Sequence, residues 1–199
     1  MSGGAAALIA FEAVACVRGG RTLFDDISFA LASGEALWVR GANGVGKSSL
    51  LRLAAGLLRP IAGTVTRRAR HAIADENPAL DRELTLRNAL AFWAQIDGRG
   101  LGDVDDALAA LGIERLADVP VRILSTGQRR RAGLARLITS GAVIWLLDEP
   151  ANGLDPAAQT LLEAAIAAHR AHGGTVILAS HQPVDLPGAQ QLTLAGAGA

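Results

Sequence analysis

The chain has 199 residues with 19 basic and 19 acidic side chains, so it carries no formal net charge at pH 7. This balance disfavours a nucleic-acid binder, because such proteins normally have a basic excess or a clustered basic face. Apolar residues make up 50% of the chain, which excludes an intrinsically disordered protein and suffices for the core of one domain. Lys47 is the only lysine, and we expect it to mark a position where the planar guanidinium of arginine does not fit.

The sequence predicts a soluble, cytosolic protein. No basic side chain precedes Arg18, so the N-terminus lacks the pattern of a secretory signal. The longest strongly apolar run, residues 142–147, stops at Asp148 and is too short to span a bilayer. Cys16 is the only cysteine, which excludes an intrachain disulfide, a zinc cluster of cysteines and a haem attachment motif.

The first third of the chain predicts an antiparallel β layer followed by a strand, loop and helix. Alternate residues from Ile9 to Val17 (Ile9, Phe11, Ala13, Ala15 and Val17) share one expected strand face, and Ile27, Phe29 and Leu31 share another. Gly19 and Gly20 between them predict a turn. The next predicted elements are a strand at 37–40, a helix at 49–58 stopped by Pro60, and a strand at 63–66.

The remainder of the chain alternates helices with apolar strands. Residues 85–117 have helical spacing with a break at 98–102, which predicts a helical insertion. Strands that are apolar throughout and alternate with helices indicate a parallel sheet covered on both faces. The predicted elements are a helix at 129–140, a strand at 142–147, a helix at 156–172 with Asp155 as its N-cap, and a strand at 175–179.

Residues 41–48 match the phosphate-binding pattern G-x-x-x-x-G-K-[ST], after a predicted strand and at the start of a predicted helix. Glycines allow backbone N–H groups to surround phosphate, and the helix N-terminus adds partial positive charge. We expect Lys47 to reach the β- and γ-phosphates and Ser48 to ligate Mg²⁺. The candidate nucleotide-binding residues of this segment are Gly41, Ala42, Asn43, Gly44, Val45, Gly46, Lys47, Ser48 and Ser49.

Two carboxylates, Asp148 and Glu149, follow the apolar strand at 142–147. A carboxylate at the end of a buried strand requires a cation or hydrogen-bond donors to offset its desolvation. Asp148 is predicted to hold Mg²⁺ through its water shell, and Glu149 to act as the catalytic base that polarises the attacking water. The alternative, two solvated acids at an ordinary strand end, is disfavoured by the phosphate-binding loop in the same chain.

A second candidate anion site consists of Ser125, Thr126, Gly127 and Gln128, which precede the helix predicted to begin at Arg129. Such a site has a use if two chains meet head to tail, so that it faces the phosphates bound by the other chain. The alternative is a simple helix cap by Ser125 or Thr126. For Arg129, Arg130 and Arg131 that follow, we favour a solvated helix face over a nucleic-acid patch.

The order of these motifs resembles the ATP-binding subunits of ABC transporters over essentially the whole chain. Residues 124–128 are similar to the family's signature, 152–155 to its D-loop, and His181 to its switch histidine. The resemblance implies an α/β P-loop NTPase fold of ABC type, with a mainly parallel sheet, an N-terminal antiparallel β layer and a helical insertion. It also implies a single ATP-binding domain over residues 1–199, with a helical subdomain at about 78–140.

In that family, two subunits enclose two ATP molecules, and the resemblance implies ATP and Mg²⁺ as cofactors. Ser125 and Gly127 would contact the γ-phosphate bound by the partner chain, His181 would hold that phosphate and the attacking water, and Asp155 would link the two sites. The implied partners are a second ATP-binding chain and integral membrane permease subunits. The implied location is the cytoplasmic face of the bacterial inner membrane.

Two positions differ from the family pattern. Arg18 occupies the place of the aromatic side chain that stacks on adenine; a guanidinium can also stack on a base, which leaves the choice between ATP and GTP open. No glutamine lies at residues 74–78, where the family's Q-loop glutamine is expected. Glu76 or Asn77 could supply an oxygen to Mg²⁺ instead.

Several short segments are similar to the ATP-binding subunits of haem exporters in bacterial cytochrome c maturation. This resemblance implies that ATP hydrolysis drives haem export or release of a haem chaperone, with haem itself handled by the partners. An exporter of lipid, drug or peptide is the alternative, and a soluble ATPase acting on DNA or ribosomes is disfavoured because tandem cassettes and basic linkers are absent. The segments are residues 21–24, 127–131, 134–137 and 181–183.

Overall fold

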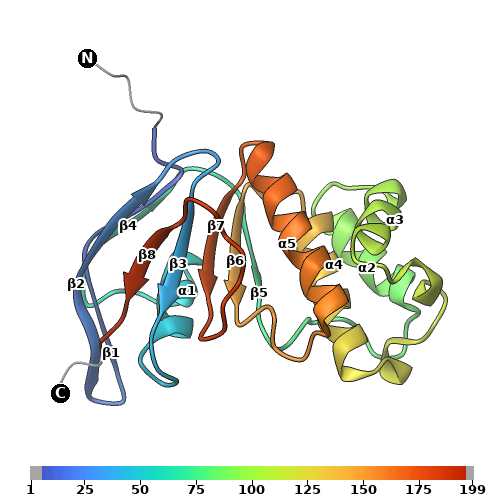
Figure 1. Ribbon diagram of the computed structural model, residues 1–199, viewed down its shortest axis with the longest axis horizontal. Helices are drawn as coiled ribbons and strands as arrows, with labels where there is room; N and C mark the ends of the chain where they lie inside the picture. Colours follow the sequence, from blue (N-terminus) through green and yellow to red (C-terminus); the bar gives the residue numbers. More distant parts are fainter. Residues whose placement is uncertain (1–5, 196–199) are drawn as a thin grey trace.

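The computed structural model describes residues 6–195 and contains an antiparallel sheet, a parallel sheet and a group of helices (Figure 1). The antiparallel sheet has the strand order β2-β1-β4. Its first two strands meet at Gly19 and Gly20, which both have positive φ and form the predicted turn. The strands are β1 (Ile9–Arg18), β2 (Arg21–Leu31) and β4 (Ala62–Arg67).

A β-bulge in β1 makes the simple alternation predicted for this strand wrong. The register with β2 shifts between Phe11 and Val14, and Ala13 has a φ of 49°. The extra residue turns Val14 into the core and leaves Ala13 exposed. On the neighbouring strand, a Cβ at Gly63 would lie 2.3 Å from the carbonyl oxygen of Ala13, so only glycine fits beside the bulge.

The second sheet has five parallel strands in the order β5-β6-β7-β3-β8, which confirms the predicted parallel core. The two strands at its edges, β5 and β8, were not among the predicted elements. Edge strands are partly solvated and need no continuous apolar run, so β8 with the sequence Gln-Gln-Leu-Thr has no hydrophobic signal. The strands are β3 (Ala36–Arg40), β5 (His71–Ala74), β6 (Ile144–Asp148), β7 (Thr175–Ala179) and β8 (Gln190–Thr193).

Alternate side chains of the parallel strands fill two separate cores. Leu146 and Ile177 pack with Leu50 of α1 (Lys47–Ala54) and with the antiparallel sheet. Leu147 and Leu178 point to the other face, where α5 (Pro156–Ala171) and the remaining helices cover them. The parallel sheet is therefore buried on both faces. This packing holds the carboxyl-terminal ends of its strands in place.

The helices between β5 and β6 lie on the side of the parallel sheet away from β1, β2 and β4 (Figure 1). They are α2 (Leu86–Ile96), α3 (Leu101–Ala110), two short 3-10 turns and α4 (Thr126–Thr139). The predicted helical insertion and its break near Gly98 are present, whereas the limits of a subdomain at 78–140 stay a prediction. Within residues 6–195, the structure contains no helix that is both long enough and apolar enough to cross a membrane.

Two predicted helix boundaries are wrong for local reasons. The helix predicted to begin at Arg129 begins at Thr126, because the Ser125 hydroxyl accepts a hydrogen bond from the N–H of Gln128 at 3.2 Å. The side chain of Gln128 accepts in return from the N–H of Ser125 at 2.8 Å, which completes a capping box. Helix α1 ends at Ala54 rather than residue 58, since Gly56 adopts a left-handed φ of 71°.

Candidate nucleotide-binding site

The phosphate-binding loop between β3 and α1 forms one wall of a pocket of about 330 Å³. The other walls come from Leu23 of β2, from the last residue of β6 and from residues that follow β5, β6 and β7. The pocket therefore lies where the parallel strands end. This is the edge at which open α/β sheets bind ligands. The lining residues are Leu23, Asn43, Gly44, Gly46, Lys47, Ser48, Ser49, Glu76, Asp148, Glu149, Asn152 and His181.

The ammonium group of Lys47 is held inside the loop by backbone carbonyls. Its Nζ donates to the carbonyl oxygens of Gly41 at 2.9 Å and Ala42 at 3.4 Å, and the residue is 6% exposed. Gly46 caps α1 with a φ of 116°, and a Cβ there would lie 3.1 Å from Leu23. The loop therefore holds the Lys47 ammonium in a buried position, and the expectation that arginine does not fit there stays a prediction.

The predicted loop residues have different positions. Asn43, Gly44, Gly46, Lys47, Ser48 and Ser49 line the pocket, whereas Gly41 and Ala42 contribute carbonyls to Lys47. Val45 turns its side chain into the core beneath the loop. The first turn of α1 contains no acidic side chain, so its free N–H groups present uncompensated partial positive charge to the pocket.

Asp148 ends β6 and lines the pocket together with Ser48. Burial raises the pKa of Asp148, and a hydrogen bond with the Ser48 side chain opposes this shift. One carboxylate and one hydroxyl fit Mg²⁺ that is shared with nucleotide phosphates, since this ion keeps several water ligands. Over residues 6–195, no three His, Cys, Asp or Glu side chains form a cluster that could hold a metal alone.

Glu149, the residue after Asp148, connects Lys47 with His181. Its Oε2 lies 2.9 Å from Nδ1 of His181 and accepts from the backbone N–H of His181 at 3.3 Å, while its Oε1 lies 3.3 Å from Nζ of Lys47. Burial acts to raise the pKa of Glu149, but the His181 hydrogen bonds and the Lys47 charge outweigh it, so the pKa is lowered. Glu149 is therefore an ionised carboxylate at neutral pH.

The comparisons with known proteins are decisive at this point, because the sequence profile of the ABC transporter family matches residues 24–152. The chain belongs to the ABC transporter family. A solved structure of an ATP binding subunit of an ABC transporter has the same fold, with a TM-score of 0.79, 24% identity, and coverage of 87% of this chain and 79% of that chain. The predicted ABC ATPase fold is therefore confirmed, and the chain is an ATP-hydrolysing subunit of an ABC transporter.

The curated relatives extend over nearly the whole chain. "Cytochrome c biogenesis ATP-binding export protein CcmA" of Sphingopyxis alaskensis is 59% identical over 94% of this chain and 96% of its own length. A protein with the same description from Zymomonas mobilis is 52% identical over 94% of this chain and 85% of its own length. Another, from Rhodospirillum rubrum, is 48% identical over 96% of this chain and 87% of its own length. An ABC subunit of this kind works with membrane permease partners.

The ABC signature residues lie outside the pocket that contains the phosphate-binding loop. Ser125 caps α4, as the simpler of the two interpretations predicts, and Thr126 lines a neighbouring hollow. A Cβ at Gly127 would lie 3.1 Å from the carbonyl oxygen of Gly153, so the signature packs against the D-loop of its own chain. Asp155 accepts from the N–H of Ala158 at 2.8 Å and caps α5.

The two departures from the ABC pattern are placed differently. Glu76 lines the pocket, and Asn77 lies in an adjoining hollow with Ser48 and Asp148. Arg18 is exposed at the end of β1 and is not among the lining residues, whereas Leu23 of β2 is. An adenine contact by Arg18 stays a prediction.

The solvated face predicted for Arg129, Arg130 and Arg131 is wrong. All three are partly buried, and each donates to carbonyl oxygens of the same chain. A signal was present in the sequence: Arg130 is four residues before Leu134 and seven before Leu137, both buried, so it shares their helix face. Leu23 and Asn152 were missed as lining residues, and nothing in the local sequence marks them.

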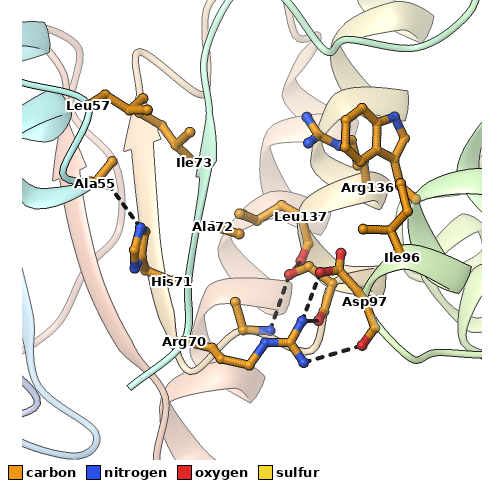
Figure 2. Close-up of a pocket in the computed structure, with 13 residues that line it drawn as sticks. Ala55, Leu57, Arg70, His71, Ala72, Ile73, Ile96, Asp97, Arg136 and Leu137 are labelled. Atoms are coloured by element: carbon orange, nitrogen blue, oxygen red, sulfur yellow. Dashed lines mark hydrogen bonds and ion pairs between the residues drawn. The ribbon is translucent and has the colours of Figure 1, made fainter. Parts of the chain in front are cut away.

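A second pocket, of about 230 Å³, lies beside the free edge of β5 (Figure 2). The end of α1, strand β5, and helices α2 and α4 line it. Arg70 forms an ion pair of 2.8 Å with Asp97 on one side, and the Arg136 guanidinium stacks on Trp93 on the other. Leu57 and Ile96, which are 69% and 61% exposed, present apolar surface at this pocket.

Proposed function

We propose that this chain is the ATP-hydrolysing subunit of an exporter complex in cytochrome c biogenesis, where hydrolysis drives haem export or the release of a haem chaperone. The observation that carries this proposal is the 59% identity, over 94% of the chain, to a relative described by that process. Haem is handled by the partner subunits. Export of a lipid, drug or peptide would use the same ATPase chemistry, and the relatives favour cytochrome c biogenesis over it.

The residues of the pocket divide into phosphate-binding, metal-holding and proton-accepting groups. Lys47 and the N-terminus of α1 bind the β- and γ-phosphates. Ser48 and Asp148 hold Mg²⁺. When bound, this ion supplies positive charge that offsets the negative charge of the phosphate oxygens. Glu76, which lines the same pocket, is the residue that we assign to the Q-loop position, and its carboxylate would supply an oxygen to this ion.

Glu149 and His181 act on the attacking water. The lowered pKa of Glu149 keeps its carboxylate ionised and able to accept the proton of the water. Because Glu149 is ionised, Nδ1 of His181 is the donor in their hydrogen bond. This leaves Nε2, on the other side of the ring, to contact the γ-phosphate. Binding of ATP replaces the Glu149 contact of Lys47 with phosphate contacts, which frees Oε1 for the water.

A second copy of the chain completes each site. Since Ser125, Thr126, Gly127 and Gln128 do not line the pocket of their own chain, they are available to the nucleotide bound by the partner. Two copies arranged head to tail would place the N-terminus of α4 against the γ-phosphate, where Ser125 and Gly127 donate hydrogen bonds. Asp155 and the D-loop then lie between the two sites, and Arg18 lies near adenine.

The pocket beside β5 is the contact surface for a cytoplasmic segment of the membrane permease. It offers an unpaired strand edge, exposed Leu57 and Ile96, and the Arg70–Asp97 ion pair for polar contacts. Strand β5 leads directly to Glu76 in the nucleotide pocket, so a partner on this edge is connected to the site by two residues of backbone. Such a contact would hold the chain at the cytoplasmic face of the inner membrane.

Affinity purification from membranes, followed by identification of the captured subunits, tests this proposal. We expect integral membrane proteins of cytochrome c biogenesis to co-purify, and Leu57→Glu combined with Ile96→Glu to remove them while nucleotide binding persists. The matched control is Ile123→Glu, an exposed apolar residue that does not line the second pocket. Capture of an unrelated permease would support the alternative export functions, and capture of ribosomes or DNA would contradict the transport role.

A further inference from the structure

The guanidinium of Arg130 lies where three segments of the nucleotide site meet. Arg130 is in the second turn of α4, close to the signature. Its Nη1 donates to the carbonyl oxygen of Asp75 at 2.7 Å, and its Nη2 donates to that of Asp148 at 2.7 Å and to that of Glu149. One side chain therefore joins the signature helix to the ends of β5 and β6.

The bonds of Arg130 go to backbone atoms, although four carboxylates surround it. Burial lowers the pKa of Arg130, and the negative charges of Glu76, Asp148, Asp75 and Glu149 oppose that shift. The guanidinium remains protonated, because arginine does not lose its charge in proteins. It is thus a fixed cation whose Nη1 and Nη2 donate to the main chain next to the carboxylates, while its buried Nε has no hydrogen-bond partner in the described part of the chain.

Glu149 has a backbone conformation that needs external support. Its φ of 46° lies in the left-handed region, which is unfavourable for a residue with a Cβ. On one side its N–H donates to the carbonyl oxygen of Ala179 in β7 at 2.8 Å. On the other side its own carbonyl oxygen accepts from Arg130 and, at 3.2 Å, from the backbone N–H of Asn152. Arg130 is the only charged donor among these contacts, which hold the peptide groups on both sides of the Glu149 Cα.

We propose that Arg130 is a positioning residue for hydrolysis, which holds Glu149 in the left-handed conformation that directs its carboxylate at the attacking water. The inference rests on the proposed role of Glu149 as catalytic base. The direction of a side chain follows from the backbone at its Cα. Loss of Arg130 leaves the Glu149 carbonyl with the Asn152 N–H alone, and this weaker hold lets the carboxylate rotate away from His181. Arg129 and Arg131 do not share this role, since their bonds go to residues 124, 126, 111 and 112.

The substitutions Arg130→Gln and Arg130→Lys test the proposal in steady-state and single-turnover ATPase assays. We expect Arg130→Gln to lower kcat at least tenfold and to leave the Kd for a fluorescent ATP analogue within threefold. Arg130→Lys should restore part of kcat, because it keeps the charge but lacks the fork of donors. Arg131→Gln is the matched control, with an expected effect on the thermal midpoint rather than on kcat.

A double-mutant cycle with Glu149→Gln separates positioning from general damage. If Arg130 acts through Glu149, adding Arg130→Gln to Glu149→Gln should lower the single-turnover rate by less than threefold further. An unchanged kcat in Arg130→Gln and Arg130→Lys, or the same fold-loss with and without Glu149, would overturn the proposal. Full hydrolysis by Glu149→Gln alone would instead overturn the assignment of the base.

Discussion

Glu149 accepts two hydrogen bonds from one residue, His181, through its imidazole Nδ1 at 2.9 Å and its backbone N–H at 3.3 Å. Both bonds end on Oε2, while Oε1 is buried, faces Lys47 and has no hydrogen-bond partner among residues 6–195. His181, which follows β7, therefore orients the carboxylate of Glu149. Its hydrogen bonds and the charge of Lys47 keep that carboxylate ionised. One oxygen is left for the reacting water once Lys47 turns to phosphate.

Glu149→Gln should abolish multiple turnover and retain ATP binding, because an amide cannot accept the proton of the attacking water. We expect a loss of about 10²–10⁴-fold in kcat, the usual contribution of a general base. Size-exclusion chromatography with light scattering should show a dimer with ATP and Mg²⁺ and a monomer without them. A protein that stays monomeric with ATP would contradict the two-chain site.

Lys47→Arg is expected to fail almost as completely as Lys47→Ala in nucleotide binding. The ammonium donates to the carbonyls of Gly41 and Ala42 in a buried position, and the wider, planar guanidinium is not expected to reproduce this geometry. Calorimetric titration with ATP should show at least a tenfold weaker Kd for both variants. Arg59→Lys, at an exposed position outside the pocket, is the control for the general effect of exchanging the two cations.

Asp148→Asn should stabilise the nucleotide-free protein at neutral pH. The raised pKa of Asp148 means that its ionisation costs more in the folded chain than in the unfolded chain. Stability is therefore lost as pH rises from the unfolded value of about 3.9 through the folded pKa, and the amide avoids that loss. We therefore expect Asp148→Asn to have a higher thermal midpoint than the parent protein at pH 7.

Thermal unfolding scans at several pH values measure the difference in midpoint between Asp148→Asn and the parent protein. This difference should shrink as pH falls from the raised pKa of folded Asp148 towards the unfolded value of about 3.9, and it should disappear below that value, where the carboxyl is protonated in both states. A midpoint at pH 7 below that of the parent protein would show that the charge stabilises the fold instead.

Ser125→Ala and Ser125→Asp separate the two roles of the signature serine. Loss of the cap in Ser125→Ala should lower the thermal midpoint by about 2–4 °C, since an N-cap contributes about 1 kcal/mol. Aspartate is also a good N-cap and should keep the midpoint, but its charge would repel the partner's γ-phosphate. We expect both variants to lose ATP-dependent dimerisation; a dimer formed by Ser125→Asp would restrict Ser125 to the capping role.

The sequence predicts the interior of this fold better than its edges. The central strands β6 and β7 are buried and mainly apolar, and the carboxylates and His181 at their carboxyl ends line the pocket. The edge strands β5 and β8 carry no comparable signal, because one side of each is solvated. The bulge at Ala13 depends on Gly63, which is far away in sequence and close only in the folded sheet.

The sequence predicts those candidate site residues whose side-chain chemistry is itself the signal. It misses residues that contribute through their position in the folded chain. The sequence indicates Lys47, Asp148 and Glu149 because each is a charged residue next to an apolar strand or a glycine-rich loop. Arg130 looks like one of three surface arginines until its contacts with the carbonyls of Asp75 and Asp148 are seen. Every residue has a backbone carbonyl, so a hydrogen bond to that group does not restrict which residue type accepts it. The sequence therefore does not reveal such a bond.

The most direct test of the central claim is deletion of the gene in its source bacterium, followed by complementation with the parent sequence or with Glu149→Gln. Covalently bound haem in gels and difference spectra of membranes measure c-type and b-type cytochromes separately. The account predicts that deletion removes c-type cytochromes and spares b-type ones, and that the parent gene restores them while Glu149→Gln does not. Unchanged c-type cytochromes in the deletion strain would contradict it.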